Sequence, residues 1–450
     1  MKIAIIGAGW AGMAAAVEAT QAGHHAIVFE ASSAIGGRAR AVNGRLADGT
    51  PVTLDNGQHI LIGAYTETLR LMHLVGVQAE VALLQRPMTL LFPDGLGLRF
   101  PAWPTPLDAL AGIVAARGWS VADKWSLLRL ATGWKLSGFR CDPATSVAAL
   151  CQGLRPRVLA ELIEPLCVSA LNTPAGRASA QVFLRVMRDA LFGVQGGSRL
   201  LLPRVDLSAL FPQAAARWLT QRGGQIRLGT RVDSVFQQGS QWRVQEEVFD
   251  AVIFATSASA SVRILENTEQ VAPDSVANKI QQWVRITRAL QFEAIATVYA
   301  WGSGVSLPYP MLTLRSNAAT VTPSATPAPA QFVFDRGQLG GPQGLLAFVV
   351  SASTGERETL QAQVLTQAKQ QLGLTLQAVQ TIVEKRATFA CTPGLLRPAQ
   401  QIATGLVVCG DYVDGPYPAT LEGAVRSAMA AVKAAIHSWP LPGQVRENTV

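Results

Sequence analysis

A glycine-rich turn near the start of the chain sets the strongest limit on its fold. The apolar run 2–6 is typical of a short buried strand, and the turn GAGWAG at 7–12 follows it directly. An alanine-rich stretch then continues to Gly23, and a second apolar run at 26–29 ends in Glu30. The order of strand, GxGxxG, helix, strand and acid predicts a dinucleotide-binding βαβ unit.

Each glycine of this turn has a separate physical purpose. Gly7 permits the tight turn, Gly9 lets the backbone approach a pyrophosphate, and Gly12 lets the helix pack against the strand. The N-terminus of the helix would face the phosphates, and an acid about 20 residues further on would bind the ribose hydroxyls. The predicted nucleotide-binding residues of the unit are Gly7, Gly9, Trp10, Ala11, Gly12 and Glu30.

Composition narrows the class of protein. The 450 residues are 49% hydrophobic and 15% charged, so the chain can bury a large core and is not expected to be disordered. The net charge of +8 comes without a block of Lys and Arg, so no nucleic-acid partner is predicted. No apolar run reaches about 18 residues, so no membrane span is predicted. The mean hydropathy of +0.23 therefore indicates either a large core or a strongly apolar ligand.

The cysteines and the first residues of the chain indicate the cellular compartment of the protein. The five cysteines are odd in number and form no CxxC pair, which favours reduced thiols over disulfides or a metal site. Met1 and Lys2 precede an apolar stretch, but the glycines and Glu18 that follow favour a strand and a phosphate turn over a signal peptide. We therefore expect a cytoplasmic protein without a bound metal.

The residues after Glu30 extend the fingerprint. The stretch ASSAIGGR at 31–38 carries Gly36, Gly37 and Arg38. This pattern resembles the FAD-dependent amine oxidase and carotenoid desaturase superfamily. The resemblance implies that the cofactor is FAD, that Gly36 and Gly37 form a close backbone turn, and that Arg38 stands near the flavin's phosphates.

The resemblance returns near the other end of the chain. An apolar run ends in Gly410 and Asp411, and PATLEG at 418–423 opens a helix of small residues. In the superfamily, the aspartate holds the ribityl-phosphate side of FAD. The helix N-terminus, here with Thr420 and Leu421, faces the pyrimidine ring of the flavin.

Two internal stretches add to the resemblance. The segment GTRVDSV at 229–235 resembles a family strand in which the residue at the position of Val232 touches the adenine. The segment DNGQH at 55–59 stands where relatives carry Asp-x-Gly beside the isoalloxazine ring. The resemblance therefore implies that Gly57 and Gln58 contact the flavin.

The predicted fold is α/β, with a discontinuous Rossmann-like FAD-binding domain and an inserted α+β substrate domain. A Pro/Ala/Thr-rich stretch at 316–330 is predicted to be a loop. No second GxGxxG is present, so electrons are expected to pass through an external partner or dioxygen. The predicted boundaries are 1–60, 200–260 and 395–438 for the FAD-binding domain, 61–199 and 261–394 for the substrate domain, and 439–450 for a C-terminal tail.

One group within the superfamily accounts for most of these motifs. DNGQH and PATLEG resemble the hydroxysqualene dehydroxylases, the squalene-associated FAD enzymes of bacterial hopanoid pathways, and the resemblance covers nearly the whole chain. It implies an isoprenoid lipid substrate, an external electron donor and neighbouring squalene-pathway enzymes. A carotenoid-like desaturase is the main alternative. An amine oxidase ranks lower because Thr420 stands where those enzymes commonly carry an aromatic residue, and a non-catalytic flavin-bearing lipid carrier ranks last.

The reaction implied by that group, reductive loss of an allylic hydroxyl, sets chemical requirements. The hydroxyl leaves only when an acid protonates it or donates a hydrogen bond to it, and a hydride from reduced flavin would then complete the hydrocarbon. His59 is the first candidate for the donor and Asp335 is the second. On the sequence alone, His59 is equally compatible with a hydrogen bond to backbone that shapes the flavin turn. For Asp335, an ion pair with Arg336 or a turn cap is favoured over catalysis.

A basic, tryptophan-rich region between 103 and 140 raises the question of a membrane. Five cations and one acid lie between Arg117 and Arg140, among leucines at roughly helical spacing. Such a helix can lie in the headgroup layer, which predicts peripheral docking at the inner face of the cell membrane. A core-packed helix with a solvated basic face is the alternative. The tryptophans of the region are Trp103, Trp119, Trp125 and Trp134.

Overall fold

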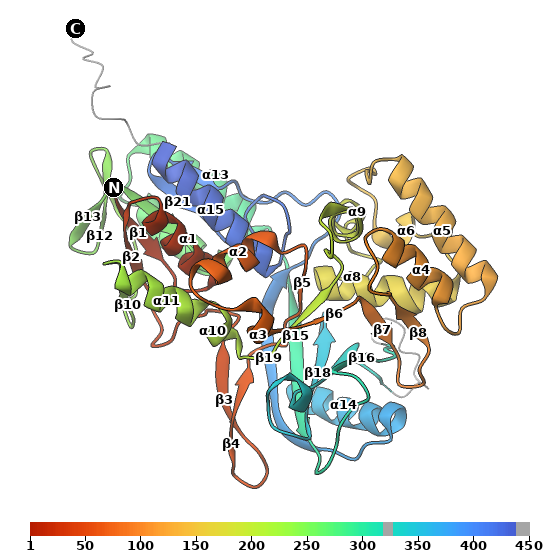
Figure 1. The fold of residues 1–450 in the computed structure, drawn as a ribbon. Helices are drawn as coiled ribbons and strands as arrows, with labels where there is room; N and C mark the ends of the chain where they lie inside the picture. Colours follow the sequence, from red (N-terminus) through yellow and green to blue (C-terminus); the bar gives the residue numbers. More distant parts are fainter. Residues whose placement is uncertain (318–326, 438–450) are drawn as a thin grey trace.

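The structure is a computed structural model that describes residues 1–317 and 327–437 (Figure 1). The predicted tail at 439–450 and most of the predicted loop at 316–330 lie outside the described residues. The chain builds two main sheets and a group of helices at one end. In Figure 1 the first sheet is on the left, the second is below the centre, and the helices are on the right.

The first sheet has six strands in the order β10-β2-β1-β14-β21-β20. Its first five strands are parallel, and only β20 at the edge runs antiparallel. This confirms the predicted Rossmann-like fold. The strands are β1 (Lys2–Ile6), β2 (His25–Phe29), β10 (Gln225–Arg227), β14 (Ala251–Phe254), β20 (Gln401–Ala403) and β21 (Leu406–Val408).

Small residues let helices approach this sheet closely. In α1 (Trp10–Gln21), six of the residues are alanine or glycine and nine residues are buried. Helices α11 (Pro212–Gln221) and α15 (Leu421–His437) pack against α1, and all three share one hydrophobic core with β1. Helices α12 (Ala258–Glu269) and α13 (Asp274–Arg288) pack against each other.

The sheet draws on three separated parts of the chain, 2–29, 225–254 and 401–408. Each part lies inside one of the segments predicted for the FAD-binding domain, whose boundaries stay a prediction. The predicted strand at 229–235 is wrong as a strand, because the ladder of β10 ends at Arg227. The chain then bends so that the amide of Thr230 donates to the carbonyl of Glu30 at 2.8 Å, and Val232 lies in a segment without ladder pairing.

The second sheet is antiparallel and has the order β16-β17-β18-β15-β19. Along β17 the side chains alternate, so that Val333 packs in the core beneath α14 while Phe332 and Phe334 belong to the core on the opposite face. The elements are β15 (Phe292–Trp301), β16 (Met311–Thr313), β17 (Phe332–Asp335), η3 (Gly337–Leu339), β18 (Leu345–Ser351), α14 (Arg357–Leu372) and β19 (Gln377–Phe389).

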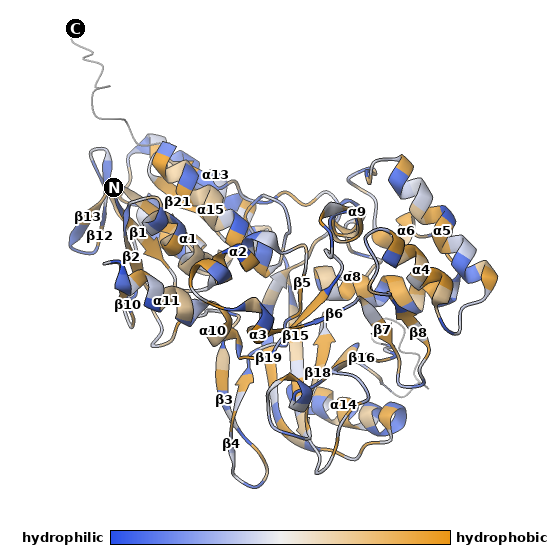
Figure 2. Ribbon diagram, viewed as in Figure 1, coloured by the Kyte–Doolittle hydropathy of each residue, from blue (hydrophilic) through white to orange (hydrophobic). Residues whose placement is uncertain are grey.

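The helical end contains two π-helical turns, η1 and η2, next to ordinary helices. Figure 2 shows α4 and α8 as mostly hydrophobic, whereas hydrophobic and hydrophilic segments alternate along α5. The elements are α4 (Leu107–Ala115), α5 (Val121–Leu136), α6 (Val147–Leu150), α7 (Pro156–Val158), η1 (Leu159–Ile163), α8 (Glu164–Leu171), α9 (Ala180–Arg188) and η2 (Asp189–Gly193).

Short elements connect these parts. The strands are β3 (Ala41–Arg45), β4 (Pro51–Asp55), β5 (Leu61–Ile62), β6 (Leu83–Arg86), β7 (Thr89–Leu91), β8 (Gly97–Arg99), β9 (Leu200–Pro203), β11 (Phe236–Gln238), β12 (Gln241–Val244) and β13 (Glu247–Phe249). The helices are α2 (Thr66–Leu74), α3 (Ala79–Ala82) and α10 (Leu207–Leu210).

The basic, tryptophan-rich region between 103 and 140 forms two helices. It folds as α4 and α5, and its tryptophans divide between the core and the surface. Trp119 is buried with its indole N–H donating to Glu161 at 2.9 Å, and Trp134 is buried against Phe183, whereas Trp103 and Trp125 are exposed. The prediction of a surface role therefore fails for Trp119 and Trp134.

The described residues contain no helix long and apolar enough to cross a membrane, and no group of His, Cys, Asp and Glu arranged to hold a metal ion. All five cysteines are free thiols, as their spacing predicted, and four of them are buried. Burial raises the pKa of Cys151 and of Cys391 to about 12. These thiols therefore act as small apolar side chains of the core.

Candidate active site

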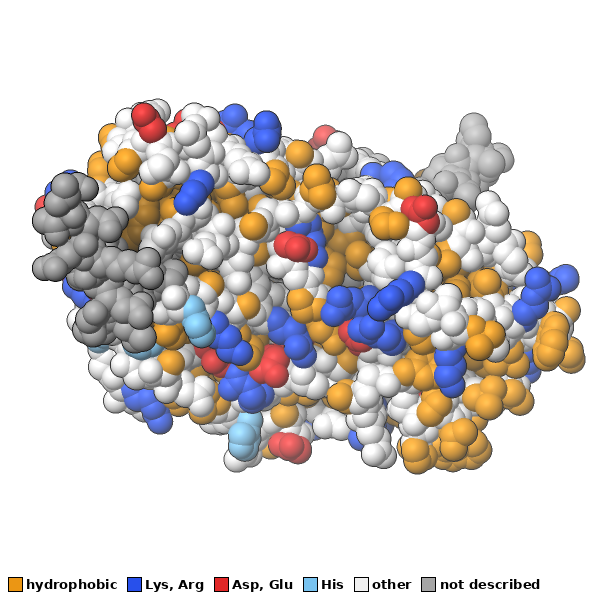
Figure 3. All heavy atoms as spheres, turned by 90° about the horizontal axis from the view of Figure 1, so that it is seen from above, with side chains coloured by type: hydrophobic (Ala, Val, Ile, Leu, Met, Phe, Trp, Pro, Cys, Tyr) orange, Lys and Arg blue, Asp and Glu red, His pale blue; other side chains and the backbone are white. Residues whose placement is uncertain are grey.

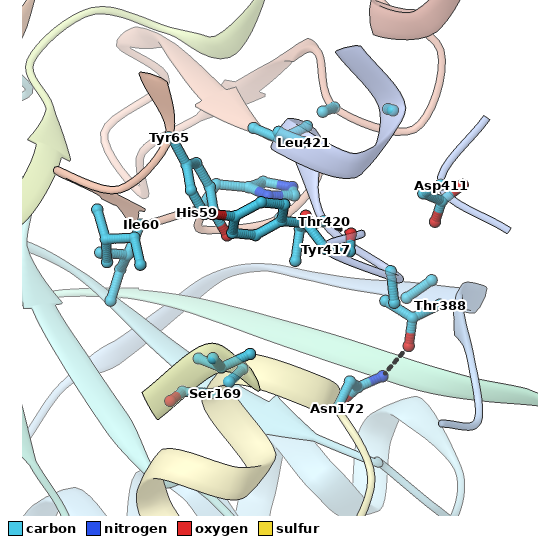
Figure 4. A pocket seen from close by; sticks show the side chains of 18 of the residues that line it. His59, Ile60, Tyr65, Ser169, Asn172, Thr388, Asp411, Tyr417, Thr420 and Leu421 are labelled. Atoms are coloured by element: carbon cyan, nitrogen blue, oxygen red, sulfur yellow. Dashed lines mark hydrogen bonds between the residues drawn. The ribbon is translucent and has the colours of Figure 1, made fainter. Parts of the chain in front are cut away.

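A single cavity of about 880 Å³ runs from the glycine-rich turn to the helical end of the molecule. At one end it is lined by the residues after β1, β2 and β21, the carboxyl ends of parallel strands, where open α/β sheets bind ligands. At the other end it passes over β17 and β18 and between α4, α5 and α8. Figure 4 shows part of its wall, with His59, Tyr65, Tyr417, Thr420 and Leu421 projecting from neighbouring segments.

The turn after β1 leaves no room for side chains. A Cβ on Gly12 would lie 1.9 Å from the carbonyl oxygen of Gly7, so only glycine lets α1 begin this close to the turn. Gly7 has a φ of 110°, which L side chains rarely adopt, and its amide donates to the carbonyl of Phe29 at 2.7 Å. Gly9 precedes α1 and lines the cavity, so the free amides of the first turn face the space beside it.

Glu30 stands at the end of β2, as the sequence predicted. One of its carboxylate oxygens accepts a hydrogen bond from the amide of Ala8 at 2.7 Å and the other accepts one from Ser32 at 2.8 Å. These two bonds hold the carboxylate at the rim of the cavity, which Glu30 lines. Each oxygen keeps a second lone pair, so the group can still accept a hydrogen bond from a ribose hydroxyl.

The Gly-Gly-Arg segment closes over the first turn. The amide of Gly36 donates to the carbonyl of Ala8 at 2.9 Å, and a Cβ on Gly37 would lie 3.1 Å from the Cα of Gly9. The indole N–H of Trp10 donates to the carbonyl of Ala39 at 3.0 Å and so ties α1 to the same segment. The structure thus brings the two predicted glycine motifs into direct contact.

Arg38 and Asp411, which are far apart in the sequence, form an ion pair at 2.5 Å. The nearby Asp411 raises the pKa of Arg38, so the guanidinium stays charged. Arg38 also donates to the carbonyl of Ala387 at 2.6 Å. Asp411 follows Gly410, whose amide donates to the hydroxyl of Ser427 in α15 at 3.0 Å. The pair joins the first sheet to β19 at the edge of the cavity.

The start of α15 is a second helix N-terminus that faces the cavity. The hydroxyl of Thr420 accepts a hydrogen bond from the amide of Gly423 at 3.0 Å and donates to the carbonyl of Tyr417 at 2.7 Å. A Cβ on Gly423 would lie 2.0 Å from the carbonyl oxygen of Tyr417, so this turn also requires glycine. Thr420 and Leu421 line the cavity, and Val232 lines it at the opposite, nucleotide end.

These observations fit an extended FAD molecule. Two helix N-termini, at α1 and α15, favour phosphate and the electron-rich edge of a flavin ring. Glycines whose Cβ would meet backbone keep the cradle open, and Glu30 and Arg38 supply an acceptor and a cation beside it. All predicted cofactor residues that line the cavity lie in this part of it: Gly7, Gly9, Trp10, Ala11, Glu30, Gly36, Gly37, Arg38, Gly57, Gln58, Val232, Gly410, Asp411, Thr420 and Leu421.

His59 faces the cavity from the segment after β4. Within the described residues its ring makes no hydrogen bond with protein, so the alternative of a bond to backbone does not hold. Burial, together with the charge of Arg38, lowers the pKa of His59 to about 4. The imidazole is therefore neutral at pH 7 and has both nitrogens available to a ligand.

Asp335 does not line the cavity. It is buried at the end of β17, where its carboxylate accepts hydrogen bonds from the amide of Leu307 at 2.9 Å and the hydroxyl of Ser306 at 3.1 Å. The side chain alternation of β17 sends Phe334 into the cavity and Asp335 away from it. The predicted catalytic role of Asp335 is therefore unsupported, and the turn-capping interpretation describes what the residue does.

Arg336 also differs from expectation. It forms no ion pair with Asp335, and its guanidinium instead donates to the side chain oxygen of Gln58 at 3.3 Å. The second sheet thus supports the turn that carries Gln58 and His59. Only the three-dimensional fold joins these residues, so no local pattern in the sequence could predict the contact.

A pair of tyrosines lies on the cavity wall: Tyr417, a weaker proton-donor candidate from the sequence, and Tyr65, which the sequence did not predict. The rings of Tyr65 and Tyr417 lie 6.4 Å apart at an interplanar angle of 80°. Burial and the nearby negative charge of Asp189 in η2 together raise the pKa of Tyr417 to about 12. Both tyrosines stay protonated at neutral pH. Tyr417 has a φ of 57°, an uncommon conformation for a bulky residue that is often found at functional sites.

The rest of the cavity is lined mainly by apolar residues. Asn172, at the end of α8, is one of its polar residues and donates to the hydroxyl of Thr388 at 3.0 Å (Figure 4). Walls of this kind exclude water and suit a hydrocarbon chain. The apolar lining includes Met88, Leu98, Phe100, Leu127, Leu162, Ile163, Leu166, Leu200, Ile295, Phe332, Phe334 and Val349.

Comparison with known proteins places this geometry among flavoproteins. A family model described as flavin containing amine oxidoreductase matches residues 10–436. A protein of Sinorhizobium fredii named hydroxysqualene dehydroxylase is 26% identical over 97% of this chain and 98% of its own length. One of the same name from Rhodopseudomonas palustris is 26% identical over 95% and 96%. A zeta-carotene desaturase of Synechocystis is 38% identical, but over only 21% of this chain and 19% of its own.

Solved structures show the same fold at lower identity. An oxidoreductase from Methanosarcina mazei superposes with a TM-score of 0.67 at 16% identity, covering 96% of this chain and all of the other. Cyclohexylamine oxidase from Brevibacterium oxydans superposes with a TM-score of 0.64 at 15% identity, covering 97% of this chain and 98% of the other.

Proposed function

Because the chain belongs to the flavin containing amine oxidoreductase family, we propose that this FAD-dependent oxidoreductase removes the hydroxyl group of hydroxysqualene to give squalene. The observation that carries the proposal is the full-length similarity to proteins named hydroxysqualene dehydroxylase, which spans both the cofactor cradle and the apolar cavity. The wider setting of the proposal is squalene and hopanoid biosynthesis.

The reaction requires one proton and two electrons, and the bonds that break and form are fixed. The allylic C–O bond breaks, the hydroxyl leaves with one proton as water, and a C–H bond forms at the same carbon. Two electrons arrive as a hydride, which FAD supplies in its reduced form when bound. The protein must therefore hold the carbon chain, exclude water and deliver one proton to the hydroxyl oxygen.

His59 is the residue that we propose as the proton donor. Its ring lines the cavity without a protein partner, and a pKa near 4 makes its protonated form a strong acid. Tyr417 is the neighbouring candidate, because its hydroxyl is protonated at neutral pH and faces Asp189. The faces of Tyr65 and Tyr417 would also stabilise positive charge that develops on the allylic carbon.

Anaerobic mixing tests the proposal directly. Photoreduced protein mixed with hydroxysqualene is expected to reoxidise and to release one squalene for each flavin. Reoxidation of the flavin without squalene, or squalene without reoxidation, would contradict the proposal. In a separate aerobic assay with oxidised flavin, polyene absorbance from a carotenoid-like isoprenoid would instead favour a desaturase, and peroxide formed with an amine would favour an oxidase.

The identity of the donor is tested by the pH dependence of that same step. If protonated His59 gives the proton, the rate of reoxidation rises as the pH falls from 8 toward 5, because more of the imidazole is protonated as the pH approaches its pKa of about 4. The variant His59→Gln is expected to lose this rise and to react at least tenfold more slowly. Tyr417→Phe is the matched variant, and a flat profile that only Tyr417→Phe slows would assign the donor to Tyr417.

A carotenoid-like desaturase is the second candidate, because one stretch of this chain is 38% identical to a zeta-carotene desaturase. That match covers about a fifth of the chain, so it supports similarity in one part of the molecule and not across the whole cavity.

The proposed function also includes an external electron donor, contact with neighbouring squalene-pathway enzymes, and a cytoplasmic location at the inner face of the cell membrane.

A further inference from the structure

The cavity reaches the surface between α4 and α5. Leu107 and Leu110 of α4 line the cavity and are also 56% and 47% exposed, so they form part of its mouth. Phe192 of η2 lines it and is 40% exposed, and Lys135 of α5 lines it with its ammonium group 5.6 Å from the centre of the Phe192 ring. The mouth is therefore apolar, with a cation on its rim.

The surface around this mouth is also apolar. Leu107, Leu110 and Val114 follow one another at helical spacing along α4, and Val121, Trp125 and Leu136 lie on one exposed stripe of α5. Figure 3 shows hydrophobic side chains gathered at the end of the molecule that α4 and α5 form in Figure 1. We call this the α4–α5 surface and define it as Trp103, Leu107, Leu110, Val114, Val121, Trp125 and Leu136.

The exposed charges of the stretch 103–140, which carries the α4–α5 surface, have one sign. Arg117, Arg129, Lys135 and Arg140 are exposed, and none of them forms an ion pair with the described residues. The two acids of the same stretch are buried and engaged. Asp108 accepts a hydrogen bond from Ser198, and Asp123 completes the N-terminal cap of α5 with Ser120 and pairs with Arg155. A solvated helix face commonly mixes both signs, so this arrangement complements a negatively charged partner.

We propose that the α4–α5 surface docks on a bilayer that contains anionic lipid, so that the mouth between α4 and α5 opens into the hydrocarbon layer and loads the substrate from it. The inference rests on the proposed function, because an isoprenoid substrate dissolves in that layer. Exposed apolar side chains of α4 and α5 enter the acyl boundary, while the arginines beside them meet the phosphates of the headgroups. Substrate then reaches the cavity without crossing water.

Flotation with vesicles tests the docking. The wild-type holoenzyme is expected to float with phosphatidylcholine vesicles that contain phosphatidylglycerol, and to float much less with phosphatidylcholine alone or at high salt. Arg117→Gln/Arg129→Gln/Arg140→Gln is expected to weaken partitioning about a hundredfold, since each cation near an anionic surface contributes about fivefold. Val114→Ser/Trp125→Ser is expected to weaken it at least tenfold. None of these five residues lines the cavity.

Matched controls carry the same changes elsewhere on the surface. Arg217→Gln/Arg243→Gln/Arg285→Gln removes the same charge, and Val271→Ser/Leu396→Ser removes two exposed apolar side chains. Both controls are expected to float as the wild type does. Retained circular dichroism and flavin absorbance would show that every variant is folded.

Turnover separates this inference from the proposed function. With hydroxysqualene dispersed in detergent, the surface variants should match the wild type, whereas with vesicle-borne hydroxysqualene they should be slower by the factor seen in flotation. No turnover of wild type in detergent would overturn the proposed function and leave the docking result standing. Equal flotation of surface variants and controls would overturn the docking. So would a wild-type dimer that Val114→Ser/Trp125→Ser converts to monomer without any effect on flotation, because the surface would then be a protein interface.

Discussion

At the scale of single residues, the shape of the cofactor site depends on positions where only glycine fits. Three glycines of the cradle, Gly7, Gly12 and Gly423, stand where a Cβ would lie within 3 Å of a backbone oxygen. Backbone cannot give way as the end of a flexible side chain can. A larger residue at any of these positions would require the turn or the helix to move. Because the turn and the helix line the cavity, such a movement would change the space in which the cofactor binds.

The variant Gly12→Ala tests this reading. Its methyl group would lie 1.9 Å from the carbonyl oxygen of Gly7, so α1 must shift and the variant is expected to lose bound flavin and several kcal/mol of stability. Absorbance of the purified protein and urea unfolding measure both effects. Gly133→Ala in α5 is the control, because its Cβ meets open space and the change should stabilise that helix by about 0.5–1 kcal/mol. Full flavin in Gly12→Ala would contradict the argument.

His59 gives a prediction about pH. Its pKa is lowered from 6.5 to about 4 in the folded protein, so the unfolded chain binds a proton below pH 6.5 while the folded protein does not. The free energy of unfolding therefore falls as the pH drops from 6.5 to 4, by about 1–3 kcal/mol from this residue. Urea titrations at pH 7.5 and 5 should show a smaller loss in His59→Gln than in the wild type. An equal loss in both proteins would mean that the ring is solvated.

At the scale of elements, one contact explains the acid in the Glu-Gly-Ala motif. Glu422 of α15 is fully buried, and its carboxylate accepts hydrogen bonds from the amides of Glu67 and Thr68, the Thr68 hydroxyl and the guanidinium of Arg426. It thus caps α2, whose own N-cap residue, Tyr65, offers no side chain bond. Because Tyr65 also faces the cavity, the acid fixes a wall of the site from behind.

The variant Glu422→Gln should weaken this cap. The amide group cannot accept at both positions, so the free energy of unfolding is expected to fall by about 1–3 kcal/mol, and turnover should fall as Tyr65 loses its support. Urea unfolding and the anaerobic reoxidation rate measure the two effects. Glu67→Gln, which removes only a surface pair with Arg70, should cost less than about 1 kcal/mol. Equal losses in both variants would show that the cap adds nothing.

The elements divide into those that the sequence could predict and those that it could not. The βαβ unit at 2–30 and the strand before Asp411 were predictable, because glycine motifs and short apolar runs act over a few residues. The strand expected at 229–235 was wrong, since an edge strand ends wherever its neighbour ends, and β10 stops beside Phe29. The π-helical turn that carries Asp189 has no local signature that distinguishes it from a helix.

The candidate site also contains residues that the sequence could predict and residues that it could not. Residues that touch the cofactor cradle lie in short motifs and were found, whereas Tyr65, Asp189 and the contact from Arg336 to Gln58 depend on how distant segments meet. The chemistry of a carboxyl group makes Asp335 a candidate on the sequence alone, but the period of two along β17 turns it away from the cavity. That orientation follows from which face of the sheet is covered by α14, which the sequence around 335 does not record.

At the scale of the whole molecule, the two main sheets behave as one body because buried groups join them. The hydroxyl of Tyr299 in β15 donates to the carbonyl of Asp55 at 2.9 Å and accepts a hydrogen bond from its amide at 3.2 Å. Asp55 ends β4 and leads into the turn that carries Gly57 and His59. The second sheet therefore holds the flavin turn from below.

Replacing this tyrosine tests the coupling. Tyr299→Phe leaves the amide and the carbonyl of Asp55 buried without their partner, so a loss of about 1–3 kcal/mol is expected. Flavin release and tryptophan fluorescence should follow one urea transition in the wild type, and flavin should be released at a lower urea concentration in the variant. A Tyr299→Phe protein with an unchanged, single transition would show that the sheets are not coupled through this contact.

The assembly of the first sheet from three distant stretches has a consequence for how the protein is made. Translation delivers β1 and α1 first, but the strand that flanks β14 on its other side, and the Asp411 that pairs with Arg38, arrive nearly four hundred residues later. A nascent chain therefore carries an open strand edge at β14 until β21 leaves the ribosome. Tight cofactor binding is expected only once β21 and Asp411 have been made, so the flavin absorbance of a preparation reports how many of its molecules have these elements in place.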